Sequence, residues 1–439
     1  MRKLLPLFVL AMLYSEVATA LEFTLHKLDS GVTGPTLLVI GGIQGDEPGG
    51  FTAASLLVND YQVTKGQVWI VPNLNFDSII RRSRGIYGDM NRKFSTLRNS
   101  DPEFETIGKI KAIIKDPQVS MILNLHDGSG FYHEEYIDKD ENSQRWGQSI
   151  VIDQSTIPAK HYGDIESVAR RVIASANRDT ADSKAQFRLK NTRTREGDKE
   201  MEKTLTYFAI NNGKAAMGIE ASKNYPTHVR TLQHLRVLES MMDTMGITYS
   251  RNFKLTEKSV FDKIGSNIQL ALFDNKIRLD LDDSRRSIGY VPMKKRSPME
   301  FTANNPLVAV VKSNQGYKVR YGNRGVTFLD PQHFIFDDSL QQADFEIDGK
   351  NRLVPLGTVV DVNESFSVTP IKDHRVNIIG FKRTGYSNES GLSIRRHEIL
   401  PRFSVDKQAN KFRVEFYKGK KYSGMVLVNF VGDNKLAKK

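Results

Sequence analysis

Residues 36–48 of the 439-residue chain read TLLVIGGIQGDEP, and this stretch is the clearest indication of the fold. The run at residues 36–41 is apolar and β-branched, which predicts a buried strand. A glycine-rich turn follows it just as a helix is expected to begin, without the Gly-Lys-Ser/Thr ending of a phosphate-binding loop. A strand that leads through such a turn into a helix is typical of an α/β domain, in which ligands bind at the carboxyl ends of the strands.

The same alternation continues through the first half of the chain. Two more buried strands are predicted at residues 67–71 and 120–125. Helical patterns are predicted at residues 101–115, 165–177 and 229–245. Strands that alternate with helices predict a largely parallel or mixed sheet covered by helices on both faces.

The pattern changes after about residue 250. Short runs at residues 277–281, 366–368 and 412–416 alternate with period two and are separated by turn residues. No helix is predicted in this part, which favours two small all-β domains, the last a candidate immunoglobulin-like sandwich. The expected domains are therefore an α/β domain over residues 21–249, a small β domain over 250–341 and a C-terminal β domain over 342–439.

The composition limits the chemistry. The chain has a formal net charge of +12, contains 39% hydrophobic residues and has no cysteine. A chain of this length can bury a large core in several domains. The lack of cysteine excludes disulfide frameworks, iron–sulfur clusters and thiol nucleophiles, so any metal must be held by His, Asp, Glu or an amide oxygen.

Residues 1–20 have the features of a signal peptide. Arg2 and Lys3 precede an apolar run at residues 4–13, and Ala18 and Ala20 fit a small-x-small cleavage site. The run is too short for a permanent membrane span, although an N-terminal anchor or a buried helix is the alternative. We expect cleavage after Ala20 and export to a bacterial periplasm, where a chain without cysteine has nothing to misoxidise.

Three polar side chains are expected to meet just beyond the strands. Gln44 and Glu47 lie three residues apart where a helix begins, and His126 follows the predicted strand 120–125. If the two strands are parallel, an amide oxygen, a carboxylate and an imidazole converge at one edge of the sheet. Three such donors that leave a fourth position for water describe a catalytic zinc rather than a structural one.

This arrangement resembles the zinc signature of carboxypeptidase A-like metallocarboxypeptidases, in which His-x-x-Glu is followed much later by His. Gln44 stands where most members of the family have the first His. Two further stretches extend the resemblance. Residues 89–94, DMNRKF, resemble the family's Asp-Leu-Asn-Arg-x-Phe, and residues 216–222, AMGIEAS, resemble the strand that carries its catalytic glutamate.

The resemblance implies a role for each remaining candidate. Asn91 and Arg92 would bind the terminal carboxylate of the substrate, Arg84 would polarise the scissile carbonyl, and Glu220 would act as general base. These roles suit the chemistry, because a guanidinium can donate two parallel hydrogen bonds to a carboxylate and zinc lowers the pKa of its water to about 7. The family's mobile-loop tyrosine has no counterpart about twenty residues before Glu220, and Tyr207 is the nearest candidate.

Glutamine at the first ligand position is typical of a small subgroup of this family, the periplasmic D,L-carboxypeptidases that trim peptidoglycan tripeptides and determine the shape of helical and curved Gram-negative bacteria. The chain resembles this subgroup in its signal peptide, length, glutamine and β-rich second half. The resemblance implies an enzyme with one zinc ion that removes terminal meso-diaminopimelate from muramyl-L-Ala-D-Glu-mDAP. An acidic wall peptide suits the positive net charge, and no nucleic acid is expected because an exported chain rarely meets any. No membrane span is expected, since no later segment approaches the length of one, and the β domains could bind a wall or protein partner.

Two other classes of protein stay open at this point. One is a small-molecule amidohydrolase similar to aspartoacylase, which shares the zinc triad and the Arg-x6-Asn-Arg spacing. The predicted signal peptide and the long β-rich part count against that class. The other is a catalytically dead wall-binding scaffold, because a glutamine oxygen is a weaker zinc donor than imidazole.

Overall fold

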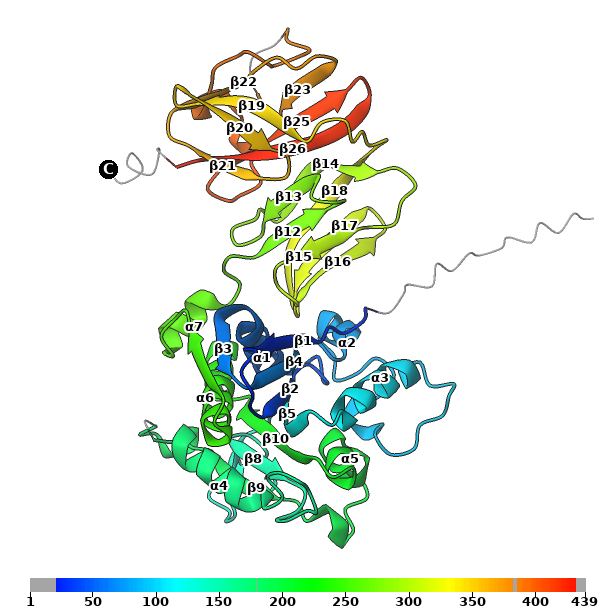
Figure 1. Ribbon diagram of the computed structural model, residues 1–439, viewed down its shortest axis with the longest axis vertical. Helices are drawn as coiled ribbons and strands as arrows, with labels where there is room; N and C mark the ends of the chain where they lie inside the picture. The colour runs from blue at the N-terminus through cyan, green and yellow to red at the C-terminus, as the bar shows by residue number, and fades with distance from the viewer. Residues whose placement is uncertain (1–20, 179, 382–384, 432–439) are drawn as a thin grey trace, which may run out of the picture.

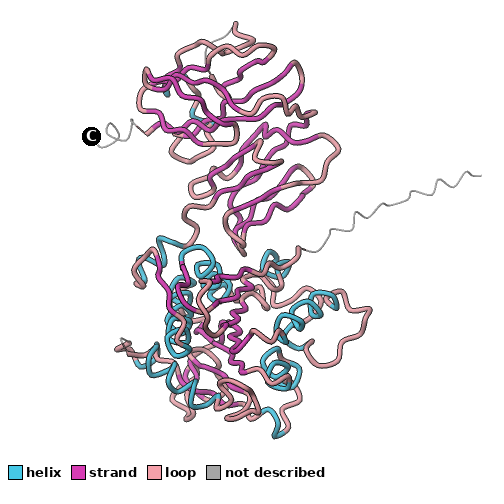
Figure 2. The backbone as a smooth tube through the Cα atoms, viewed as in Figure 1, coloured by secondary structure: helices cyan, strands magenta, loops and turns pink. Residues whose placement is uncertain are grey.

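The structure is a computed structural model that describes residues 21–178, 180–381 and 385–431. The predicted signal peptide lies outside the described residues. Figure 1 shows an α/β domain at one end of an elongated molecule and two β-rich modules beyond it. The tube in Figure 2 shows the same division, since the helices gather almost entirely in the first domain.

A seven-stranded mixed sheet forms the centre of the α/β domain, with the strand order β1-β4-β2-β5-β10-β8-β9. Its strands are β1 (His26–Asp29), β2 (Thr36–Ile40), β4 (Gln67–Val71), β5 (Val119–Gly128), β8 (Ser149–Ile152), β9 (Arg188–Asn191) and β10 (Ala215–Ser222). The central strands β4, β2, β5 and β10 run parallel to one another, whereas β1 and β8 pair antiparallel with their neighbours β4 and β10. The predicted mixed α/β sheet is therefore confirmed.

Helices cover both faces of this sheet (Figure 1). They are α1 (Pro48–Asp60), α2 (Phe76–Arg81), α3 (Phe104–Lys115), α4 (Ile165–Ala176), α5 (Leu205–Asn211) and α6 (Thr227–Met245). Helices α1 and α4 each pack on α6, while α3 and α5 lie against β5 from the other side. The helix predicted from residue 101 begins at Phe104, because Asp101 accepts a hydrogen bond from the backbone N–H of Glu103 in a preceding turn.

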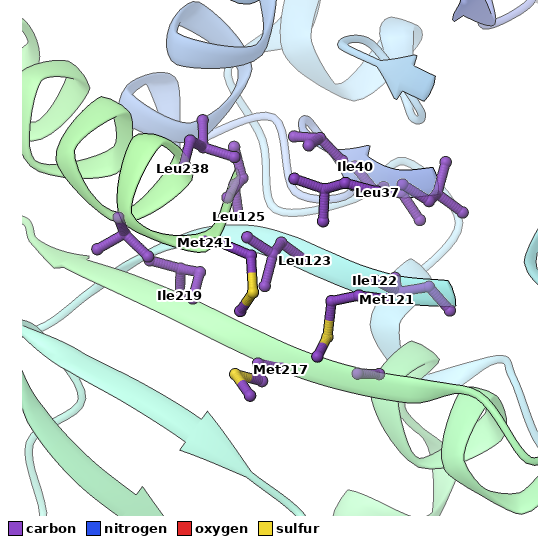
Figure 3. Packing of buried hydrophobic residues seen from close by; sticks show 14 of the residues in the cluster. Leu37, Ile40, Met121, Ile122, Leu123, Leu125, Met217, Ile219, Leu238 and Met241 are labelled. Atoms are coloured by element: carbon purple, nitrogen blue, oxygen red, sulfur yellow. The ribbon is translucent and has the colours of Figure 1, made fainter. Parts of the chain in front are cut away.

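Part of the core of the domain lies between the central strands and α6. Figure 3 shows Leu123 of β5 and Ile219 of β10 close to Leu238 and Met241 of α6, and all four side chains are buried. Strands that are buried on both faces need apolar residues at every position rather than at alternate positions. This requirement explains the continuous apolar runs from which the strands were predicted.

One expectation for the second part of the chain is wrong. A helix, α7 (Glu257–Lys263), lies beyond residue 250, where no helix was predicted. It has seven residues, buries only Val260, and has Thr256 as its N-cap, whose side chain accepts a hydrogen bond from the backbone N–H of Ser259. A helix of two turns with one buried residue produces no helical periodicity in the sequence.

Beyond α7 the chain is rich in β strands. The first module holds β12 (Gln269–Leu272), β13 (Ile277–Asp280), β14 (Ser287–Lys294), β15 (Phe301–Ala303), β16 (Val308–Ser313), β17 (Gly316–Tyr321) and β18 (Arg324–Phe334). They form a three-stranded sheet, β13-β12-β15, and a four-stranded sheet, β14-β18-β17-β16. Their hydrophobic core includes Phe51 of α1, so this module packs directly on the α/β domain.

The last module has two four-stranded sheets, β20-β19-β22-β24 and β21-β26-β25-β23. The strands are β19 (Gln342–Ile347), β20 (Lys350–Pro355), β21 (Val359–Val362), β22 (Ser365–Val368), β23 (His374–Ile378), β24 (Ile394–Arg395), β25 (Lys411–Lys418) and β26 (Lys421–Phe430). Tyr422 and Met425 of β26 also belong to the core of the preceding module, which ties the two modules together. The domain boundaries given above stay predictions.

Smaller pairs complete the fold. They are β3 (Tyr61–Lys65) with β11 (Thr248–Arg251), and β6 (Phe131–Tyr132) with β7 (Glu141–Asn142). Within the described ranges, no helix is both long and apolar enough to cross a bilayer.

Candidate active site

The structure brings Gln44, Glu47 and His126 together. Strands β2 and β5 are parallel neighbours, so the turn after β2 lies beside His126 near the end of β5. Nδ1 of His126 lies 3.1 Å from Oε1 of Gln44 and 2.9 Å from Oε2 of Glu47, and all three side chains are buried. Gly45 allows this turn, because a Cβ there would lie 2.0 Å from the backbone of Ser78 in α2.

The three donor atoms suit a single metal ion. Ligand atoms placed 2.0–2.2 Å from a tetrahedral zinc lie about 3.4 Å apart, so small shifts would let these atoms share one ion. Glu47 is the N-cap residue of α1, yet its side chain makes no capping hydrogen bond and faces His126 instead. The described residues contain no group of three His, Cys, Asp or Glu that could hold a metal, and the amide oxygen of Gln44 completes the set.

Asp89 fixes the orientation of the Gln44 amide. Oδ1 of Asp89 accepts a hydrogen bond of 2.8 Å from Nε2 of Gln44, which turns the amide oxygen toward His126. Burial acts to raise the pKa of Asp89, but the Gln44 hydrogen bond and the charge of Arg84 hold that pKa below its usual value. This orienting role was not predicted, although Asp89 opens the DMNRKF stretch from which two other site residues were predicted.

The second nitrogen of His126 lies against two asparagines. Nε2 is 2.8 Å from Nδ2 of Asn124 and 3.4 Å from Nδ2 of Asn91, and Oδ1 of Asn124 is buried without a hydrogen-bond partner among the described residues. A histidine that binds a metal through Nδ1 carries its proton on Nε2 and needs an acceptor there. Rotation of the Asn124 amide supplies that acceptor and gives the orphaned oxygen a donor, so the surroundings of His126 fit a metal ligand.

Glu220 lies next to His126 on the neighbouring strand. Strands β10 and β5 are parallel, and Glu220 and His126 are partners in their register. Burial raises the pKa of Glu220 to about 8; His126 acts to lower it, and Glu47 and Asp127 act to raise it. A carboxylate that interrupts an otherwise apolar strand at this point faces the same cavity as the metal-site residues.

A cavity of about 350 Å³ joins these residues. Its lining includes every site residue predicted from the sequence, namely Gln44, Glu47, Arg84, Asn91, Arg92, His126 and Glu220. Oδ1 of Asn91 accepts a hydrogen bond from the backbone N–H of Leu205, which holds η1 (Met90–Arg92) against the start of α5. Tyr207 also lies on α5, but it packs against the hydrophobic core of the domain.

Other lining residues were not predicted. Beside the predicted set, the wall includes Trp146, Val151, Met201, Thr204, Thr206, Gly218 and Lys223. Trp146, Thr204 and Lys223 lie in loops and turns, and the other four come from β8, β10, α5 and a 3-10 helix at Met201–Lys203. Two of the seven had a usable signal, because Gly218 falls within the AMGIEAS stretch and Lys223 follows Glu220 by three residues in the turn that ends β10.

A buried charge cluster fastens the start of α1 to the end of β5. Asp127 accepts hydrogen bonds from the backbone N–H of Gly49, from Nη1 of Arg230 at 2.7 Å and from Nε2 of His234 at 3.1 Å. Its own backbone N–H donates to Oε2 of Glu47 at 3.1 Å. The cluster therefore fixes Glu47 relative to the neighbouring strand. Sequence reasoning missed it, because Arg230 and His234 lie about a hundred residues from Asp127.

Substitution of Arg230 by methionine is expected to lower the free energy of unfolding by about 3 kcal/mol, because it leaves the carboxylate of Asp127 buried with a weaker set of partners. Urea unfolding followed by circular dichroism measures the change. Arg170→Met is the control, because the Arg170–Glu166 pair is exposed and should contribute little. Equal losses in the two variants would contradict a stabilising role for the buried cluster.

Comparison with known proteins identifies the family. A family model described as the catalytic part of a carboxypeptidase controlling helical cell shape matches residues 3–265. The chain belongs to this family. A second model, described as the C-terminal domain of metallo-carboxypeptidase, matches residues 336–431 of this chain. No curated protein matches the chain.

Solved structures of the cell shape determinant Csd4 from Helicobacter pylori are similar over almost the whole chain. The apo structure is 37% identical with a TM-score of 0.88, and the match covers 93% of this chain and 100% of that one. A tripeptide-bound structure has the same identity and coverage with a TM-score of 0.87. A structure with bound mDAP, described as a D,L-carboxypeptidase, is 39% identical with a TM-score of 0.86 over 91% of this chain and 97% of that one. The predicted family and enzyme class are confirmed: the chain is a metallocarboxypeptidase.

Proposed function

We propose that this metallocarboxypeptidase removes terminal meso-diaminopimelate from uncrosslinked muramyl-L-Ala-γ-D-Glu-mDAP, leaves the dipeptide on the wall, and thereby influences cell shape. The observation that carries the proposal is one cavity that combines the three metal-binding donors, the carboxylate of Glu220 and the cations Arg84 and Arg92. The similar Csd4 structures with bound tripeptide and bound mDAP support a substrate of this class.

We propose zinc as the metal, held by Gln44, Glu47 and His126. An imidazole and a carboxylate are common zinc ligands, and a tetrahedral site with three protein ligands leaves one position open for water. Bound zinc would supply a water of lowered pKa and a Lewis acid for the substrate carbonyl. The neutral amide of Gln44 is a weaker donor than imidazole, so we expect looser zinc binding than in a site with two histidines.

The chain's own side chains supply the remaining steps. Glu220 takes a proton from the attacking water and passes it to the nitrogen of the leaving amine, and its raised pKa suits both transfers. Arg84 stabilises the negative charge that develops on the carbonyl oxygen. Its guanidinium is held for this task by Oδ2 of Asp89 at 2.9 Å.

Substrate recognition uses the part of the same cavity that η1 lines. Arg92 and Asn91 bind the terminal carboxylate, with Arg92 donating two parallel hydrogen bonds. The wall near η4 (Met201–Lys203) and the start of α5 presents Thr204 and Thr206. The hydroxyl of Thr204 donates to the carbonyl of Met201 and accepts from the backbone N–H of Tyr207, so it makes this wall polar without offering a proton to the substrate.

We also propose that the enzyme works in the periplasm after a signal peptide is cleaved off after Ala20. The mass of the exported chain would test this cleavage.

The last module, whose two four-stranded sheets share one core, suits an immunoglobulin-like sandwich. Either β-rich module could bind a wall or protein partner.

Digestion of wall peptides tests the proposed function. Incubation with zinc-loaded enzyme should convert muramyl tripeptide into dipeptide and free diaminopimelate. Mass spectrometry of the digest measures this conversion. Arg92→Met should raise KM for the tripeptide about 100-fold, because the two charge-assisted hydrogen bonds from Arg92 to the terminal carboxylate are lost. Arg98→Met, at an exposed position outside the cavity, should behave as wild type. A tripeptide pool that wild-type enzyme leaves unchanged would overturn the proposal.

A further inference from the structure

One cation in the cavity has no part in the proposed chemistry. The cationic side chains that line the cavity are Arg84, Arg92 and Lys223. Arg92 binds the terminal carboxylate and Arg84 stabilises the carbonyl oxygen, which leaves Lys223 without a role. A lysine kept in a substrate cavity indicates a further negative group in the ligand.

Lys223 lies beside the metal-site carboxylate. Its Nζ is 3.3 Å from Oε1 of Glu47 and 3.4 Å from Oδ2 of Asp46, and its side chain is one-third exposed. Nη1 of Arg84 lies 3.5 Å from the same Glu47 oxygen, so the two cations flank one atom. The backbone N–H of Lys223 donates to the carbonyl of Gly128 at 2.7 Å, which fixes the turn.

Among the described residues, the ammonium group of Lys223 is held by its contacts with the carboxylates of Glu47 and Asp46. Its two contacts are longer than the 2.7–2.9 Å typical of strong charge-assisted hydrogen bonds. Lys93, by contrast, makes ion pairs of 2.7 and 2.9 Å with Glu103 and Asp101. Lys223 can therefore turn a donor toward a ligand.

The position of Lys223 indicates which part of the substrate it faces. Asn91 and Arg92 lie on η1, packed against the start of α5, and hold the residue that leaves. Arg84 marks the scissile carbonyl, and Lys223 lies next to Arg84 in the turn after β10. With the roles proposed above, the acyl residue of the peptide would continue from the carbonyl past Arg84, on the side away from Arg92. In a γ-linked D-glutamate, this acyl residue carries a free α-carboxylate, which an ordinary α-linked peptide lacks.

We propose that Lys223 binds the free α-carboxylate of the γ-linked D-glutamate and so determines specificity for a γ-glutamyl acyl residue. The inference rests on the proposed function. Asp46 strengthens the effect, because without Lys223 its carboxylate would repel the substrate carboxylate.

A matched pair of substrates tests this inference. One is L-Ala-γ-D-Glu-mDAP, and the other is its D-isoglutamine analogue, in which only the α-carboxylate is amidated. Wild-type enzyme should favour the acid in kcat/KM by about 10–100-fold, the range expected for a hydrogen bond to a charged group. Lys223→Met should lose this preference, because only cleavage of the acid substrate becomes slower. Lys223→Arg should keep most of the preference. Lys184→Met, at a lysine outside the cavity lining, is the control.

Zinc content, measured on the same preparations, separates substrate binding from support of Glu47. The inference expects one zinc per chain in Lys223→Met. Loss of zinc, with both substrates slowed equally, would show that Lys223 only positions Glu47 and would overturn the inference. Equal cleavage of both substrates by wild type would overturn it while the proposed function stands. Cleavage of neither substrate would overturn the proposed function and the inference with it.

Discussion

Replacement of Glu220 by glutamine is expected to lower kcat about 10³-fold or more, with one zinc per chain retained. The amide has nearly the same shape as the carboxylate but cannot accept a proton from water, and general bases contribute about 10²–10⁴-fold. Loss of the second transfer, to the leaving amine, adds to the effect. Initial rates on the muramyl tripeptide, with metal analysis of the same sample, measure both quantities.

The pH dependence provides a second readout of Glu220. Burial raises its pKa to about 8, and a nearby metal ion would lower it through its positive charge. A base works only when deprotonated, so kcat/KM of the zinc enzyme should rise with pH through the pKa of Glu220 and level off above it. The rise should be absent from the residual activity of Glu220→Gln.

Glu415→Gln is a matched control for this variant. Glu415 is also a buried carboxylate in a strand, paired with Arg413 at 3.2 Å, but it lies in the last module. Its substitution should reduce stability without slowing the folded enzyme. A full rate in Glu220→Gln would show that another group removes the proton.

The fold could be predicted where burial leaves a pattern in the sequence. Strands β2, β4 and β5 are buried on both faces, so each contains a continuous apolar run: LLVI in β2, VWIV in β4 and MIL in β5. The alternation of strands and helices then implied parallel neighbours, which was enough to bring Gln44 and Glu47 to His126. Helix α7 was missed because one buried side chain in seven residues gives no periodicity.

The site could be predicted only where its residues are close in sequence or follow a strand. Asn91 and Arg92 fall within one short motif, and Glu220 interrupts an apolar strand. The contacts of Asp127 with Arg230 and His234 exist only after α6 packs on the sheet, so no local pattern reveals them. The chain has 63 lysines and arginines, and the sequence could not show that Lys223 faces the cavity.

Substitution of Gln44 by alanine is expected to weaken zinc binding at least about 100-fold, because it removes one of three protein ligands. Gln44→His should tighten binding relative to wild type, since imidazole is the stronger donor and Asp89 remains to accept a hydrogen bond from it. Competition with a zinc-binding dye measures the dissociation constants without relying on activity. Treatment of the wild type with a chelator should abolish hydrolysis, and added zinc should restore it.

Asp89→Ala tests whether Gln44 must be held in orientation to bind zinc. Without the acceptor for Nε2, the Gln44 amide can rotate and present its NH₂ group to the metal, so zinc affinity should fall about 10–100-fold although every ligand is present. Gln67→Ala is the control, because the Gln67 side chain accepts a hydrogen bond from Trp69 on β4, outside the cavity. Zinc affinity unchanged in Gln44→Ala would leave Glu47 and His126 as the only protein ligands. Affinity lost in Gln44→Ala but kept in Asp89→Ala would mean that the amide oxygen finds the metal without being oriented.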